Sequence, residues 1–330
     1  MKALAGLVLL ALLALPFVGA IPSPALPQEG PDVPAATAPV ATIVVLDHAR
    51  FTGASWQGQT INVPAGAWNR VVLTWSQKPI DDPWDRTFSA SIGGVEVLRG
   101  TTPRTEFTVT KDVTRYAALL PAGGSALVEG YADSWVGQGQ VVTLSLAFYD
   151  DPSAAAVEAP AAHVFGVQRM AGMGIGGSGP ATTIDFGATV PQSATVEFLA
   201  SGHGDQEDWF LYPESPPTFT LLVDGQPIAS AVAMPYTYAF LGFCDGPGCT
   251  GTAQDQTIAS VMWWTAQQAL DLAGVHTGVG EIPAYRATVA PQDLALLTGA
   301  HTVQVVLGHD ALGFADGSGV WVTSAQVLTG

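Results

Sequence analysis

Hydrophobic and polar residues alternate along most of the chain beyond residue 41, with the period of two that is typical of half-buried strands. The alternation is clearest between residues 69 and 109. Apolar residues there fall into sets that each occupy one side of a strand: Val71, Leu73 and Trp75; Phe88, Ala90 and Ile92; Val95 and Val97; Phe107 and Val109. Turns rich in glycine and proline separate the runs at the spacing of a β-sandwich. The pattern therefore predicts an all-β, antiparallel fold.

The alternation is interrupted by one composition break, DPSAAAVEAP at residues 151–160. We take this break as a linker between an N-terminal domain, residues 42–150, and a C-terminal domain, residues 161–330. Further strands are expected at residues 42–51, 60–66, 125–135 and 140–150 of the first domain. In the second domain they are expected at residues 163–170, 181–187, 194–204, 217–228, 285–289, 301–310 and 320–328. One helical turn is expected within residues 111–120 and a helix at residues 263–272.

The first 41 residues do not follow the strand pattern. Residues 1–20 combine Lys2 with an apolar run that ends in Val-Gly-Ala, as a secretory signal peptide does. An uncleaved membrane anchor is the alternative, but the run is short for a membrane span. Residues 21–41 are rich in proline and alanine and read as a linker. We expect a secreted or extracytoplasmic protein without membrane association after cleavage of the signal peptide.

Composition and charge narrow the possible partners. Hydrophobic residues make up 48% of the chain and charged residues only 12%, with a formal net charge of −17. Such a chain is globular, and it is a poor match for nucleic acid or anionic membranes. We expect a monomer. Cys244 and Cys249 are the only cysteines, and in an exported chain they favour a disulfide over a metal site.

Candidate chemistry gathers where two predicted strands meet. Asp81, Asp82 and Asp85 crowd around Trp84 and Arg86 in a chain with few charges. Carboxylates on the rim of a sheet, beside an aromatic ring and a guanidinium, can form the floor of an active site. The alternative is a surface turn with one Asp–Arg ion pair.

Three motifs decide between these readings, in this order along the chain: PWDR at residues 83–86, GGVEVLRGTTP at 93–103 and KDVTRY at 111–116. Their order and spacing resemble the peptide-N-glycosidase family, in particular its A-type amidases. SGHGDQEDWF at residues 201–210 and further segments extend the resemblance over roughly residues 42–328. The resemblance implies two eight-stranded antiparallel jelly-roll β-sandwich domains packed side by side, with the active site at their interface. It also implies cleavage of the amide that joins an N-glycan to asparagine.

The resemblance further implies which residues form the site. The catalytic carboxylates would be Asp85 in the WDR-type motif, Glu207 after the His-Gly segment and Asp133 in a Tyr-x-acid-x-Trp segment. Asp208 is the alternative to Glu207. The substrate-binding residues would be Trp84, Arg86, Trp135, His203, Asp208 and Trp209. No metal and no cofactor are implied, and the spacing of the histidines forms no metal-binding constellation.

Two positions depart from the family pattern. Asp133 stands where the family has a glutamate, which shortens the reach of the carboxylate by roughly 1.5 Å. Arg104 stands where A-type members usually have a glutamate, and Glu106 follows two residues later. Two functions remain open on this basis. One is an exported amidase acting on N-glycosylated peptides or glycoproteins. The other is a catalytically silent protein that binds glycans or belongs to a cell-surface assembly.

Overall fold

A computed structural model of the chain describes residues 38–80, 86–101, 106–134, 138–150, 159–203, 217–233, 284–308 and 320–330. All of these residues belong to one compact unit, residues 36–330. Several predictions lie outside the described residues: the signal peptide, nearly all of the linker at 21–41, most of the break at 151–160, and the helix at 263–272. The same holds for Asp81, Asp82, Trp84, Asp85, Arg104, Trp135, Glu207, Asp208, Trp209, Cys244 and Cys249.

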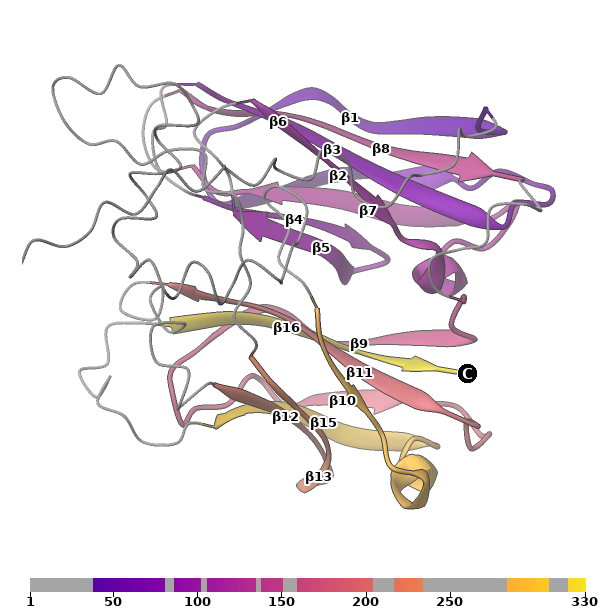
Figure 1. The fold of residues 1–330 in the computed structure, drawn as a ribbon, viewed down its shortest axis with the longest axis vertical. Coiled ribbons are helices and arrows are strands. Elements are labelled where there is room, and N and C mark those ends of the chain that lie inside the picture. Colours follow the sequence, from indigo (N-terminus) through magenta and orange to yellow (C-terminus); the bar gives the residue numbers. More distant parts are fainter. Residues whose placement is uncertain are drawn as a thin grey trace, which may run out of the picture. The chain divides into compact units, whose positions relative to one another are not determined.

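The first half of the described chain forms an antiparallel sandwich of two four-stranded sheets (Figure 1). Its strands are β1 (Ala41–Phe51), β2 (Ser55–Asn62), β3 (Arg70–Ile80), β4 (Thr87–Ile92), β5 (Val95–Thr101), β6 (Phe107–Asp112), β7 (Ser125–Ala132) and β8 (Gly139–Tyr149). The strand orders are β1-β8-β3-β6 and β2-β7-β4-β5. A 3-10 helix, η1 (Thr114–Leu119), follows β6 inside the segment where a helical turn is predicted.

The second half repeats the same connectivity. Its strands are β9 (His163–Met173), β10 (Thr182–Asp185), β11 (Ala194–His203), β12 (Thr218–Val223), β13 (Gln226–Val232), β14 (Tyr285–Thr288), β15 (Ala300–Gly308) and β16 (Val320–Thr329), with η4 (Pro291–Leu296) between β14 and β15. The sheets are β14-β11-β16-β9 and β10-β15-β12-β13, which is the order of the first sandwich advanced by eight strands. The predicted fold class, two eight-stranded antiparallel jelly rolls, is confirmed.

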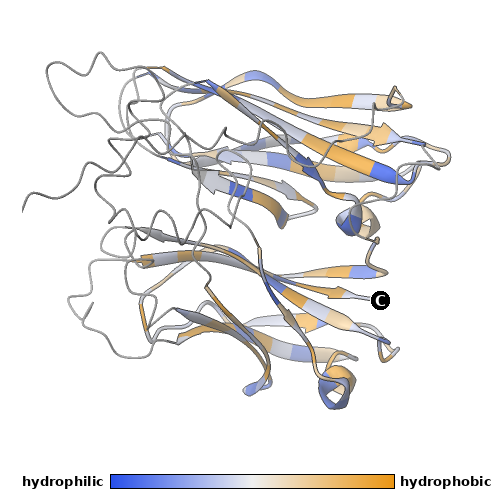
Figure 2. Cartoon of the chain, in the orientation of Figure 1, coloured by the Kyte–Doolittle hydropathy of each residue, from blue (hydrophilic) through white to orange (hydrophobic). Residues whose placement is uncertain are grey.

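Each sandwich has its own apolar core, because the inward residues of its two sheets meet. In the first, Trp75 stacks on Phe88 with ring centroids 5.3 Å apart. In the second, Phe219 contacts both Phe198 and Trp321. Hydrophobic and hydrophilic residues alternate along the strands that supply these cores (Figure 2). Among the described residues, no helix is long and apolar enough to cross a membrane.

Short turns with positive φ angles fix two hairpins. Gly93 and Gly94 have φ angles of 58° and 80° between β4 and β5. Asp224 and Gly225, with φ angles of 48° and 79°, join β12 to β13 in the same way. Two consecutive positive φ angles match the right-handed twist of a hairpin and favour glycine or aspartate. The glycine pair at 93–94 therefore marks a turn, as the sequence predicts.

The outward face of the sheet β2-β7-β4-β5 differs from a half-buried strand pattern. All six residues of β4 are buried, including its serines. On the neighbouring β5, Glu96 and Arg99 are buried as well. The reason is that β5 contacts β9, β11 and β16 of the second sandwich, so this face meets protein and not water.

Candidate active site at one end of the strands

The described ends of three neighbouring strands bring the first site residues together. Strand β4 starts where β7 and β5 end, since Phe88 pairs with Ala132 and Thr87 pairs with Thr101. One residue beyond β7, the amide of Asp133 donates to the carbonyl oxygen of Thr87 at 3.0 Å. Arg86 immediately precedes Thr87 and is partly buried. The backbones of Asp133 and Arg86 therefore lie at the same end of the strands of this sheet.

The carboxylate of Asp133 accepts a hydrogen bond from a tyrosine near the end of β7. The hydroxyl of Tyr131 donates to Asp133 Oδ1 at 3.1 Å. Burial, followed by the charge of Asp133 and this hydrogen bond, raises the pKa of Tyr131 well above its ordinary value of 10.0. The phenol therefore stays protonated at neutral pH and remains a donor to the carboxylate. The ring of Tyr131 also packs on Trp56, with centroids 5.3 Å apart.

A residue of the second sandwich packs against the Trp56 ring. The guanidinium of Arg169, on β9, lies 3.3 Å from the centroid of the Trp56 ring, in a cation–π contact. Its Nη1 atom also donates to Glu129 Oε2 on β7 at 2.7 Å. Glu129 and Tyr131 are two residues apart and therefore lie on the same face of β7. Arg169 of the second sandwich thus contacts the first sandwich next to the paired rings of Tyr131 and Trp56.

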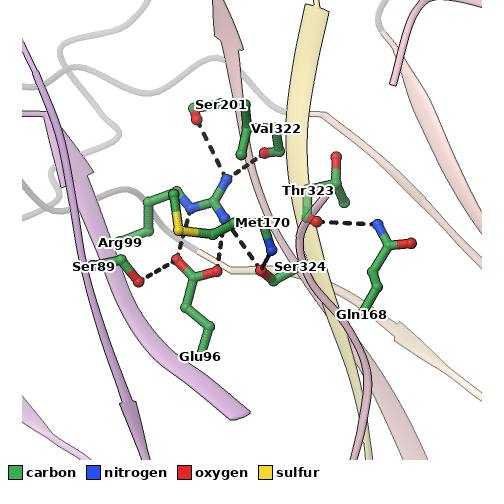
Figure 3. A network of polar contacts seen from close by, with 9 residues as sticks. All are labelled: Ser89, Glu96, Arg99, Gln168, Met170, Ser201, Val322, Thr323 and Ser324. Carbon is green, nitrogen blue, oxygen red and sulfur yellow. Dashed lines mark hydrogen bonds and ion pairs between the residues drawn. The ribbon is translucent and has the colours of Figure 1, made fainter. Parts of the chain in front are cut away.

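A second contact between the sandwiches lies on β5. Arg99 is fully buried and binds the carboxylate of Glu96 through two donors, at 2.7 and 2.6 Å. Its other hydrogen bonds go to residues of β11 and β16 (Figure 3). Neither residue was assigned a role from the sequence, although both belong to the GGVEVLRGTTP motif.

A third contact is centred on Glu197 of β11, which is also fully buried. Its carboxylate accepts from Tyr116 Oη at 2.5 Å and from Arg286 Nε at 2.7 Å, and it pairs with Arg115 Nη1 at 2.9 Å. Arg115 and Tyr116 end the KDVTRY motif, so a second family motif also serves the interface between the sandwiches.

The only sequence signal for these interface residues was a charge inside an otherwise apolar strand. Glu96, Arg99 and Glu197 each interrupt an apolar run in a chain where charged residues make up 12%. Charged residues are rarely fully buried unless they are paired. The sequence does not show where their partners lie, and the partners of Glu197 range from residue 115 to residue 326.

The predicted site residues divide into two groups. Arg86 and Asp133 lie together, and the backbone of His203 ends β11 opposite Val320. Asp85, Glu207, Trp84, Trp135, Asp208 and Trp209 lie outside the described residues. Their roles remain predictions. Within the described ranges, no three His, Cys, Asp or Glu side chains come together as a potential metal site.

Comparison with known proteins adds the family. The family model described as peptide N-acetyl-beta-D-glucosaminyl asparaginase amidase A matches residues 27–218, more than half of the 330 residues. The chain belongs to this family. The match includes the three motifs and Asp85, Asp133 and Glu207. No curated protein matches the chain in sequence.

Solved structures share the fold at low sequence identity. PNGF-II has a TM-score of 0.56 at 15% identity, over 88% of this chain and 65% of that protein. PNGase F, described as a glycosylasparaginase from Flavobacterium meningosepticum, has a TM-score of 0.53 at 16% identity, over 88% of this chain and 96% of that protein. The chain thus spans about two thirds of PNGF-II and nearly all of PNGase F. At these identities the likeness establishes the double-sandwich fold.

Proposed function

We propose that this protein is an exported amidase that cleaves the amide between an N-glycan and asparagine in glycopeptides or glycoproteins. The observation that carries the proposal is the family match, which includes all three candidate carboxylates. The position of Asp133 beside Arg86, at the strand end that follows the WDR-type motif, supports it.

The proposed chemistry is a hydrolysis driven by carboxylates. Asp85 accepts a proton from a water molecule while the water oxygen adds to the amide carbon. The negative charge that develops on the amide oxygen is stabilised by donors such as the Arg86 guanidinium. Glu207 gives a proton to the leaving nitrogen, the carbon–nitrogen bond breaks, and the asparagine becomes aspartate. Carboxylates can divide these roles when their environments separate their pKa values, so the proposed mechanism is independent of metal.

The structure suggests a supporting role for Asp133. Its carboxylate accepts from Tyr131, and its backbone pairs with Thr87, the residue after Arg86. We propose that it orients the Arg86 guanidinium or a polar group of the substrate. Aspartate is shorter than the glutamate of the family pattern. We therefore propose that Asp133 binds substrate and takes part in neither of the two proton transfers.

The test is glycan release from a glycopeptide in heavy-oxygen water, followed by mass spectrometry. Release should leave aspartate that carries one heavy oxygen, and Asp85→Asn should lower turnover by about 10²–10⁴-fold. Glu207→Gln should be nearly as damaging, and Asp133→Asn milder. Asp47→Asn is the matched control, because that carboxylate lies on β1 with its side chain 77% exposed and should not affect turnover. A native protein that binds the glycopeptide without cleaving it would instead support a silent glycan-binding module.

Export and the disulfide belong to the same proposal. We expect the secreted protein to lack residues 1–20 and to contain a disulfide between Cys244 and Cys249. An intact-mass measurement before and after reduction tests both, because reduction of one disulfide adds two hydrogens. Retention of the leader, or two free thiols before reduction, would contradict this part of the proposal.

A further inference from the structure

Arg99 is a fully buried cation whose hydrogen bonds reach both sandwiches. Nε and Nη2 donate to Glu96 Oε1 and Oε2 at 2.7 and 2.6 Å, as a planar fork on a carboxylate. Ser89 on β4 donates to Glu96 Oε1 at 2.7 Å. Both charged side chains have zero exposure, so this pair is fixed on the first sandwich and shielded from water.

The remaining donors of Arg99 reach strands of the second sandwich (Figure 3). Nη1 donates to the carbonyl oxygen of Val322 and to Ser201 Oγ at 3.4 Å. Nη2 donates to Ser324 Oγ at 3.2 Å, and the same oxygen accepts from the amide of Met170 at 2.6 Å. One guanidinium therefore connects β5 to β11 and β16, and β9 is joined to the same serine.

These contacts lie close to the strand ends that carry the proposed site. Tyr131, Ser89 and Arg99 occupy one rung across β7, β4 and β5, and Tyr131 holds Asp133. On the other sandwich, Ser201 precedes the end of β11 by two residues, which is about 7 Å of strand.

We propose that Arg99 is a positioning residue for the amidase reaction. It fixes the end of β11 against the ends of β4, β5 and β7, so that groups from both sandwiches meet one substrate amide. The inference rests on the proposed function. The Glu96–Arg99 pair with its contacts to Ser201, Val322 and Ser324 is called the cross-sandwich latch below.

The chemistry of the latch suits positioning better than stabilisation. A buried ion pair adds little net stability over an apolar pair, because loss of hydration offsets the attraction. The rigid fork of arginine, in contrast, fixes the directions of several hydrogen bonds at once, which a lysine ammonium cannot do. A displacement of about 1 Å between reacting groups can cost about 10²-fold in rate.

The chain contains a matched control for this role. Glu197 and Arg115 also form a buried pair between the sandwiches, but Glu197 lies four residues before Ser201 on β11, about 13 Å further from the strand end. The paired variant Glu96→Gln/Arg99→Met removes one ion pair and leaves neither of its charges behind. The paired variant Arg115→Met/Glu197→Gln removes the two ion pairs of Glu197 and leaves only the charge of Arg286, whose side chain is 43% exposed. Arg99→Lys keeps the charge of the latch and removes the fork.

Glycopeptide turnover and amide hydrogen exchange together test the proposal. We expect Glu96→Gln/Arg99→Met to lower kcat about 10–100-fold with KM changed less than about threefold, and Arg99→Lys to lower kcat to a lesser degree. Arg115→Met/Glu197→Gln should keep kcat within about twofold at temperatures where it is folded. Exchange at amides 199–203 should rise in the latch variant and not in the control.

The outcomes separate the latch from the proposed function. Equal losses of kcat in both paired variants, or no loss in either, would overturn the positioning role. A native protein without glycan release would refute the proposed function and, with it, the catalytic role of Arg99. Unchanged exchange at amides 199–203 in the latch variant would show that Arg99 does not hold the end of β11, whatever the activity.

Discussion

Replacement of Glu197 by glutamine is expected to weaken the contact between the two sandwiches. Glu197 is fully buried and accepts from groups on both sides: Arg115 and Tyr116 at η1, and Arg286 on the neighbouring β14. Glutamine keeps the shape and one acceptor for the Tyr116 hydroxyl. It removes the negative charge that neutralises Arg115, whose side chain is only 14% exposed.

The size of the loss in unfolding free energy depends on how far water can reach Arg115 and Arg286 once the carboxylate is gone. Removal of one partner from a buried ion pair costs about 3–5 kcal/mol, because the other charge stays buried without its counter-charge. The side chain of Arg286 is 43% exposed, so water can replace much of its contact and its share is about 0–1 kcal/mol. Since glutamine still accepts from Tyr116, we expect the lower end, about 3 kcal/mol of unfolding free energy.

Urea unfolding followed by circular dichroism and tryptophan fluorescence measures this change. Arg286→Gln is the control, since it removes the exposed partner and should cost less than about 1 kcal/mol. A loss of less than about 1 kcal/mol for Glu197→Gln, no larger than that for Arg286→Gln, would show that the charge of the buried carboxylate does not stabilise the contact between the sandwiches. Separate transitions by the two probes would show that the sandwiches unfold one after the other, and the loss should then appear in the step that separates them.

Two further predictions use the remaining polar contacts. Tyr131→Phe removes the donor to Asp133 and should lower glycopeptide turnover by up to about tenfold without loss of fold; an unchanged rate would mean that the orientation of Asp133 does not matter. The hydrogen bond to Asp224 raises the pKa of His301, and the bond from His301 lowers the pKa of Asp224. The pair therefore adds stability above the unfolded pKa of Asp224, about 4, and loses it as the pH rises through the raised pKa of His301. Asp224→Asn should return the histidine pKa toward about 6.5 in an NMR titration, and a pKa that stays raised would contradict the assigned cause.

The local pattern of the sequence was enough for the strands and several turns. Strands β3 and β11, for example, follow from the alternation of apolar and polar residues in parts of their sequences, because one side of a sheet must be apolar to enter a core. The Gly93–Gly94 turn follows from the positive φ angles that such a hairpin needs. The motif order also indicated the family before any tertiary contact was known.

The candidate site was predicted only in part. Asp133 and Arg86 could be paired in advance through their motifs, and the structure places them at one strand edge. The hydroxyl of Tyr131, which holds Asp133, was not assigned a role, because a tyrosine in an alternating strand has the same pattern whether or not its hydroxyl finds a carboxylate.

What the sequence determined by itself is local: which residues form strands, which side of each strand is apolar, and where the chain turns. Only the tertiary structure decided whether the polar side of a strand faces water or packs against the other sandwich. Ser89, Glu96 and Arg99 lie on a face that could have met water, yet the second sandwich covers it and turns Arg99 into a link with residues more than 100 positions away. The physical reason is that the alternation of apolar and polar residues indicates only that the two sides of a strand differ in polarity. Whether the polar side is hydrated or paired depends on contacts that form when the two sandwiches meet.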